Sequence, residues 1–166
     1  MPKLIMIRGN SESGKTTVAR ELQNKFGVNT MLLSQDVIRR EILKVKDAPG
    51  GPACQLLLHM LQYGRENCDI VILEGILYST YYRELFAYAK KAYKSEIYAY
   101  YYDLPFAETL RRHETKPNRH EFGESDMRRW WLEKDFLQEI PEKIITKDMS
   151  LDTAVEMIYQ EVMKGQ

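Results

Sequence analysis

One stretch near the start of the chain constrains the fold more than any other. It is Gly9–Thr17, which matches the pattern G-x-x-x-x-G-K-T. The apolar run Lys3–Ile7 precedes it, and apolar residues at helical spacing follow it as far as Gly27. A strand, a glycine-rich turn and a helix in this order predict a phosphate-binding P-loop. The residues of this loop are Gly9, Asn10, Ser11, Glu12, Ser13, Gly14, Lys15, Thr16 and Thr17.

The residue types in the loop suit a nucleoside triphosphate with Mg²⁺. Gly9 and Gly14 permit backbone dihedrals that a side chain forbids, so successive N–H groups can curl around phosphate oxygens. The positive end of the following helix points at the same place. We expect Lys15 to reach the β- and γ-phosphates and the Thr16 hydroxyl to ligate Mg²⁺.

Length and charge limit the class of protein. The chain has 166 residues and is expected to form one domain, residues 1–166. Lys plus Arg number 24 and Asp plus Glu number 24, so no net field draws the molecule to nucleic acid or to an anionic membrane. Cys54 and Cys68 do not form a C-x-x-C pair or a disulfide scaffold, which is typical of a reducing cytosol. There is no apolar run of the ~18 residues that span a membrane and no room for a signal peptide. We therefore expect a cytoplasmic protein without a membrane partner.

Segments with the character of strands and helices alternate along the chain. The expected strands cover residues 3–7, 30–34, 69–73, 96–102 and 143–146. Among the helices between them, one covers residues 35–43 with Ile38 and Ile42 on its apolar face, and Ser79 and Ser150 are expected to cap two others. This alternation predicts an α/β protein of three layers, with a five-stranded parallel sheet and helices on both faces.

Ligands of such sheets lie beyond the carboxyl ends of the strands, where two acidic residues are found. Asp36 follows a strand and begins a helix, with Arg39 three positions later on the same face. The Asp36 carboxylate could be the general base that accepts a proton from an incoming hydroxyl. The alternative is that Asp36 caps the helix and forms a local ion pair. Glu74 ends the most apolar strand, where an acid is expected beside Mg²⁺, or else it is an acid at the surface.

Basic residues gather around the polar segment 114–122. This segment suggests a lid at about residues 112–124, whose cations stabilise charge on a transferring phosphoryl group, or else a solvated charged face. Trp130 and Trp131 are expected to pack the lid helix onto the body. The basic residues are Arg111, Arg112, Lys116, Arg119, Arg128 and Arg129.

The order of these motifs resembles that of small P-loop kinases of the AAA-type P-loop NTPase superfamily. This group includes polynucleotide 5′-hydroxyl kinases, chloramphenicol phosphotransferase and zeta-toxin-type kinases, and the resemblance implies a nucleoside-kinase-like fold with a lid. Glu74 stands where several relatives carry aspartate. The matching segments are Gly9–Thr16, Ser34–Arg39, Leu73–Gly75, Tyr102–Pro105 and Thr109–Arg112.

The resemblance also implies roles for individual residues. By this resemblance Asp36 is the general base that activates the acceptor hydroxyl, and Arg39 helps to hold the acceptor. Arg112 and Lys116 match the lid residues that contact phosphates, with Arg119 close behind. ATP is the implied phosphate donor and Mg²⁺ the implied metal.

The sequence thus predicts an ATP-dependent kinase that phosphorylates a hydroxyl of a small molecule, such as a nucleoside, a sugar nucleotide or an antibiotic-like compound. We expect a monomer or a homodimer. A polynucleotide 5′-hydroxyl kinase is the first alternative, although zero net charge disfavours nucleic acid as a partner. A nucleotide-switched regulatory ATPase or GTPase is the second, although no D-x-x-G follows the third strand.

Overall fold

A computed structural model describes residues 1–117 and 119–165, and it contains a five-stranded sheet. The strands lie in the order β2-β3-β1-β4-β5, and all four neighbouring pairs are parallel. The predicted α/β fold with a five-stranded parallel sheet is therefore confirmed. The strands are β1 (Lys3–Gly9), β2 (Thr30–Ser34), β3 (Ile70–Gly75), β4 (Ile97–Tyr102) and β5 (Lys143–Ile145).

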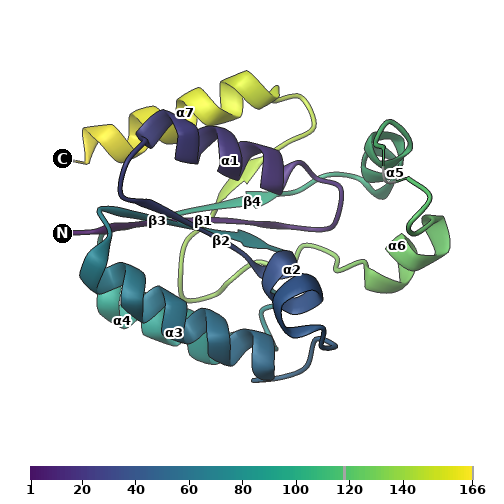
Figure 1. The fold of residues 1–166 in the computed structure, drawn as a ribbon. Coiled ribbons are helices and arrows are strands. Elements are labelled where there is room, and N and C mark those ends of the chain that lie inside the picture. The colour runs from purple at the N-terminus through teal and green to yellow at the C-terminus, as the bar shows by residue number, and fades with distance from the viewer. Residues whose placement is uncertain (118, 166) are drawn as a thin grey trace.

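Helices cover both faces of the sheet, as Figure 1 shows. One face carries α1 (Lys15–Phe26) and α7 (Leu151–Lys164), and the other carries α3 (Pro52–Asn67) and α4 (Arg83–Tyr93). Strand β1 is buried along its whole length, and its residues alternate between the two cores. Leu4 and Met6 pack with α3 and α4, whereas Ile5 and Ile7 pack with α1 and α7. A continuous apolar run is what a strand covered on both faces requires.

The helix expected at residues 35–43 is not a regular α-helix. A short α2 (Gln35–Val37) passes directly into the π-helix η1 (Ile38–Leu43). The prediction that Ile42 shares an apolar face with Ile38 is wrong, because Ile42 is 57% exposed. In a π-helix hydrogen bonds join residues five apart, so Leu43 takes the place that Ile42 would have in an α-helix. Ile38 is buried, and Leu43 packs against the same core.

Ser79 does not cap a helix, so that prediction is also wrong. Helix α4 begins at Arg83, after Tyr82, and Ser79 instead donates hydrogen bonds from its backbone N–H and its hydroxyl to Asp135. The hydroxyl of Ser79 is thus bound to a distant carboxylate and does not accept from the N–H groups of a helix. Ser150 does cap α7, since its Oγ accepts from the N–H of Thr153.

Two helices project beyond the carboxyl ends of the strands (Figure 1), namely α5 (Phe106–Glu114) and α6 (Glu124–Trp130). The predicted lid at residues 112–124 falls on the end of α5, the following loop and the start of α6, although residue 118 lies outside the described residues. Within the lid, the ring of His113 stacks on Phe122 with its Nε2 2.8 Å from the carbonyl oxygen of Phe122.

The tryptophans of the lid have different partners. Trp130 lies under the guanidinium of Arg40, whose Cζ is 5.4 Å from the ring centroid, so it bridges α6 and η1 as expected. Trp131 packs edge-on against Phe106 of α5.

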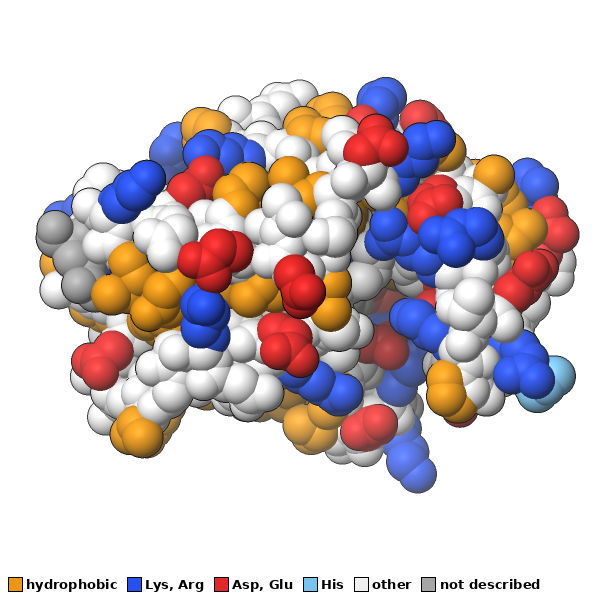
Figure 2. All heavy atoms as spheres, turned by 90° about the horizontal axis from the view of Figure 1, so that it is seen from above, with side chains coloured by type: hydrophobic (Ala, Val, Ile, Leu, Met, Phe, Trp, Pro, Cys, Tyr) orange, Lys and Arg blue, Asp and Glu red, His pale blue; other side chains and the backbone are white. Residues whose placement is uncertain are grey.

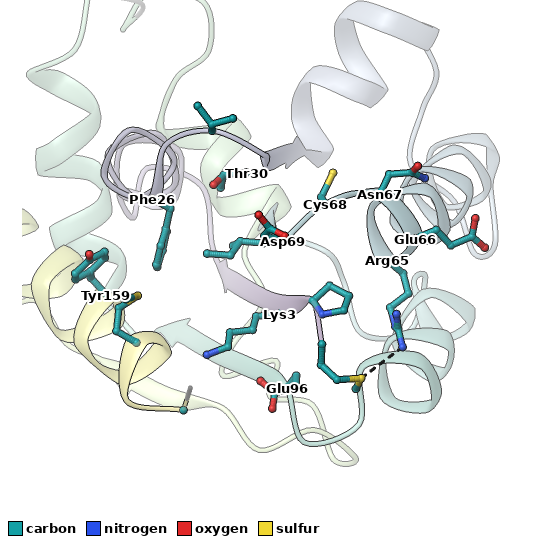
Figure 3. A pocket seen from close by; sticks show the side chains of 16 residues that line it. Lys3, Phe26, Thr30, Arg65, Glu66, Asn67, Cys68, Asp69, Glu96 and Tyr159 are labelled. Carbon is teal, nitrogen blue, oxygen red and sulfur yellow. Dashed lines mark hydrogen bonds between the residues drawn. The ribbon is translucent and has the colours of Figure 1, made fainter.

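A hollow of about 1170 Å³ lies at the opposite, amino-terminal edge of the sheet. Figure 3 shows Lys3, Thr30 and Asp69 around it, near the start of three strands, with Phe26 and Tyr159 along one side. It is thus remote from the predicted phosphate loop. In the part of the chain that is described, no helix is long and apolar enough to cross a bilayer.

Candidate active site

The loop between β1 and α1 has the backbone that a phosphate cradle requires. Gly9 has a φ of 146°, and a Cβ there would lie 2.9 Å from the Cβ and the carbonyl oxygen of Tyr102. Gly14 has a φ of 101° and immediately precedes α1. Both positions need glycine, the first for space and both for conformation. The N–H groups at the start of α1 therefore point toward the space that the loop encloses.

Lys15 is folded into this loop. Its side chain is buried, and its Nζ donates to the carbonyl oxygen of Asn10 at 2.6 Å and to the Oγ of Ser13 at 3.2 Å. Burial lowers the pKa of Lys15 to about 8, and the carboxylate of Glu74 offsets part of that effect. Phosphate oxygens would replace the carbonyl and hydroxyl oxygens as partners of the ammonium group.

Thr16 and Glu74, the two residues expected beside Mg²⁺, lie in contact. The Thr16 hydroxyl donates to Oε1 of the buried Glu74 at 3.0 Å, and the hydroxyl of Ser34, at the end of β2, donates to the same oxygen at 2.7 Å. A hydroxyl and a carboxylate are the hard oxygen ligands that Mg²⁺ prefers. Ser34 was not among the predicted site residues, although its place at a strand end beside Asp36 was a usable signal.

Few protein ligands surround this point. Among the described residues, there is no group of three His, Cys, Asp or Glu side chains that could hold a metal. Mg²⁺ is usually bound by one or two protein oxygens together with waters and substrate phosphates, so the residues present fit that ion in a nucleotide complex.

Asp36 is exposed at the same edge of the sheet, with 63% of its side chain accessible. Its Oδ1 lies 2.8 Å from Nε of Arg40 and 3.5 Å from Nη2 of Arg39. Arg39 also donates to the carbonyl oxygen of Val45. Burial is the main effect on the pKa of Lys15, and the Asp36 carboxylate is the smallest of the charges that raise it. The ion pair with Arg39 was predicted from spacing, whereas the closer one with Arg40 was not.

The lid brings two of its cations to the phosphate loop. Nη1 of Arg112 donates to the carbonyl oxygen of Ser13 at 2.8 Å, and Nζ of Lys116 lies 2.6 Å from Oε2 of Glu12. Arg119 is exposed and donates to the carbonyl oxygen of Lys116, which is a partner in the lid itself. The other basic residues of the lid pair with carboxylates within their own helices. Figure 2 shows basic side chains gathered on the lid side of the hollow between lid and body.

Comparison with known proteins agrees with this geometry. The model of a family described as an AAA domain matches residues 4–138, which is most of the chain. The chain belongs to this AAA domain family. The family is one of P-loop NTPases, as the predicted resemblance implied. The search of curated proteins found no match to this chain.

Solved structures share its fold along almost its whole length. A gluconokinase from Sinorhizobium meliloti 1021 has a TM-score of 0.71 at 14% identity, covering 98% of this chain and 93% of its own. The APS kinase of Mycobacterium tuberculosis, in complex with AMPPNP and APS, has a TM-score of 0.68 at 18% identity, covering 98% of both chains. The tunicamycin resistance protein of Deinococcus radiodurans has a TM-score of 0.63 at 19% identity, covering 98% of this chain and 96% of its own. At these identities the likeness is one of fold.

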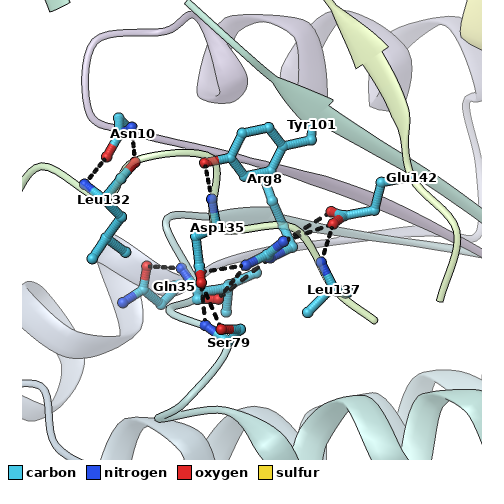
Figure 4. A network of polar contacts seen from close by, with 10 residues as sticks. Arg8, Asn10, Gln35, Ser79, Tyr101, Leu132, Asp135, Leu137 and Glu142 are labelled. Atoms are coloured by element: carbon cyan, nitrogen blue, oxygen red, sulfur yellow. Dashed lines mark hydrogen bonds and ion pairs between the residues drawn. The ribbon is translucent and has the colours of Figure 1, made fainter. Parts of the chain in front are cut away.

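One part of the site in this AAA domain was not foreseen from the sequence. The segment Leu132–Glu142, which follows the lid, is fastened to the phosphate loop and to β1 (Figure 4). The side chain of Asn10 donates to the carbonyl oxygen of Leu132 and accepts from its N–H, at 2.7 and 2.8 Å. Arg8 is fully buried, 2.8 Å from Asp135 and 2.9 Å from Glu142. A buried arginine requires anionic partners, but nothing in the sequence says which distant carboxylates supply them.

Proposed function

We propose that this AAA domain is an ATP-dependent kinase that transfers the γ-phosphate to a hydroxyl of a small molecule. One observation carries the proposal furthest: Asp36 lies two positions after Ser34, whose hydroxyl shares Glu74 with Thr16, so it lies at the same sheet edge as Lys15, beside a lid that contacts the phosphate loop. A nucleotide switch needs a phosphate loop, but it does not need a carboxylate placed for an acceptor.

The proposed reaction uses these residues in order. Lys15 and the N–H groups of the loop hold the β- and γ-phosphates. Asp36 takes the proton of the acceptor hydroxyl, whose oxygen forms a bond to the γ-phosphorus while the bond to the bridging β–γ oxygen breaks, and ADP leaves. Arg112 and Lys116 stabilise the charge on the transferring group. Thr16 and Glu74 would hold Mg²⁺, which neutralises phosphate charge when it is bound.

The solved structures support a small acceptor. Those with this fold include proteins described as a gluconokinase, an APS kinase and a tunicamycin resistance protein. We therefore propose a nucleoside, a sugar or sugar nucleotide, or an antibiotic-like compound as the acceptor class. A polynucleotide 5′-hydroxyl kinase and a nucleotide switch are the competing hypotheses.

Replacement of the proposed base tests the mechanism. Asp36→Asn is expected to bind Mg-ATP with nearly unchanged affinity and to lose about 10²- to 10⁴-fold in the rate of phosphate transfer, the usual range for a general base. Asp152→Asn, an exposed acid at the start of α7, is the matched control and should transfer normally. The readout is radiolabel from γ-labelled ATP in the acceptor. Normal transfer by Asp36→Asn would remove Asp36 as the base.

A further inference from the structure

Glu12 is the one acidic residue of the phosphate loop Gly9–Thr17. It lies in the centre of the loop with a φ of 64°, and only 7% of its side chain is accessible. Its carboxylate turns to the end of α5, with Oε2 2.6 Å from Nζ of Lys116 and Oε1 3.6 Å from Nδ1 of His113. Arg112 donates to the neighbouring carbonyl oxygen of Ser13. The lid therefore meets the loop through one carboxylate and one backbone carbonyl.

A carboxylate at this position has two opposing effects. A buried carboxylate is costly unless it is paired, so Glu12 needs Lys116 while the loop holds no anion. The same negative charge repels a triphosphate bound in the loop. Glu12 and Lys116 act on the pKa of Lys15 in opposite directions, so both charges lie within reach of the place where the phosphates are expected.

We infer that Glu12 is the resting partner of Lys116: it holds the lid over the nucleotide-free loop and gives up Lys116 to the triphosphate when nucleotide binds. Glu12 is thus a positioning residue, because it acts through Lys116 and not on the acceptor. This inference rests on the proposed function only in that a triphosphate binds the loop.

The surrounding contacts suit such an exchange. His113 faces the carbonyl oxygens of Arg119 and Phe122 with its Nε2, at 3.1 and 2.8 Å. The N–H at Nε2 donates to these carbonyl oxygens and so holds the lid loop against α5. These contacts do not involve Lys116. Arg112 is likewise held by Glu108 of its own helix, at 3.0 Å. Lys116, on a flexible four-carbon stem, can therefore change partners without unfolding the lid.

Two substitutions separate this exchange from a simple structural fastening. Glu12→Gln removes the competing and repelling charge, so Mg-ATP should bind about five- to tenfold more tightly than in the wild type. Lys116→Gln removes the same resting contact but also the cation that meets the phosphates, so Mg-ATP should bind about tenfold more weakly. Calorimetric titration with Mg-ATP alone measures both. If Glu12→Gln fails to fold, Glu12→Asp shortens the carboxylate and should shift the affinity in the same direction by less.

The lid itself gives a second readout. The two tryptophans of the chain, Trp130 and Trp131, both lie at the end of α6, so their emission reports on the lid. Without nucleotide, both variants should be quenched more by acrylamide than the wild type, and Mg-ATP should return Glu12→Gln to the wild-type value. Glu124→Gln is the matched control, because it breaks a lid pair with Arg128 that does not touch the loop, and it should behave as the wild type.

The sign of the change in affinity decides the inference. Weaker or unchanged Mg-ATP binding by Glu12→Gln would overturn it, since a permanent fastening loosens the site when it is removed. An equal change in the affinity for Mg-ATP in Glu12→Gln and Lys116→Gln would also overturn the inference. Neither measurement needs an acceptor, so this inference can fail while the proposed phosphate transfer stands.

Discussion

The ammonium group of Lys15 is buried in its own loop, where it donates to neutral oxygens. Burial disfavours the charged form and lowers the pKa to about 8, with Glu74 supplying a smaller opposite effect. Bound phosphates favour the charged form, so nucleotide binding must raise this pKa. The affinity for nucleotide is thereby linked to pH.

The affinity for Mg-ATP should therefore depend on pH in one direction. Below the pKa of about 8 the free protein already carries the proton, so affinity is level from about pH 7 to 7.5. Above that pKa the free protein must take up a proton on binding, and affinity falls by up to about tenfold per pH unit. Titration calorimetry up to pH 9.5, in buffers of different ionisation enthalpy, measures the affinity and the proton uptake. Lys15→Met should bind weakly without this dependence; a level profile in the wild type would contradict the account.

Elements that rest on local signals were predictable from the sequence. Strands β1 and β3 are apolar runs of strand length, and the glycines of the loop between β1 and α1 follow a fixed spacing. The pairs that complete the site were not predictable, because Asn10 meets Leu132 and Arg8 meets Glu142 across more than a hundred residues. Such contacts depend on how the segment after the lid returns to the sheet, which no local pattern records.

Element η1 shows how one change in periodicity alters the core. An α-helical register buries Ile42, whereas the π-helix buries Ile38 and turns Leu43 to the same core. Arg39 and Arg40, three and four positions after Asp36, both reach the same carboxylate oxygen. Single π-turns occur frequently at functional sites, in agreement with the position of η1.

A pair of alanine substitutions tests this register. Leu43→Ala should lower the free energy of unfolding by about 1–2 kcal/mol, less than for a fully buried leucine because Leu43 is only partly buried. Ile42→Ala should change it by less than about 0.5 kcal/mol, as expected for an exposed site. Urea denaturation measures both. A larger loss for Ile42→Ala than for Leu43→Ala would show that the α-helical register is the correct one.

At the scale of the whole molecule, Arg8 joins distant parts of the chain beside the candidate site. This residue lies at the end of β1, immediately before the phosphate loop, and it joins the body to the segment after the lid (Figure 4). It also donates to the carbonyl oxygen of Leu77. Burial raises the pKa of Glu142, and the guanidinium of Arg8 opposes this effect. If Arg8 were removed, the carboxylates of Asp135 and Glu142 would lose their cationic partner in a largely buried site.

Arg8→Met should therefore destabilise the whole fold. We expect a loss of about 3–5 kcal/mol in the free energy of unfolding, the range measured when one partner of a buried ion pair is removed. The control is Lys25→Met, which removes an exposed pair with Glu156 and should cost no more than about 0.5 kcal/mol. Denaturant unfolding followed by circular dichroism measures both. Equal stabilities of the two variants would show that the network around Arg8 contributes little.

Phosphate transfer to a hydroxyl is the activity that we propose for this molecule. The most direct measurement is the release of ADP from Mg-ATP with separate pools of nucleosides, sugars and sugar nucleotides, antibiotic-like compounds, and 5′-hydroxyl oligonucleotides. We predict that one of the small-molecule pools raises ADP release well above the rate with water, and that Asp36→Asn abolishes this increase. Stimulation by oligonucleotides alone would favour the polynucleotide kinase. Tight binding of Mg-ATP with equal, slow hydrolysis in every pool would contradict the account and favour a nucleotide switch.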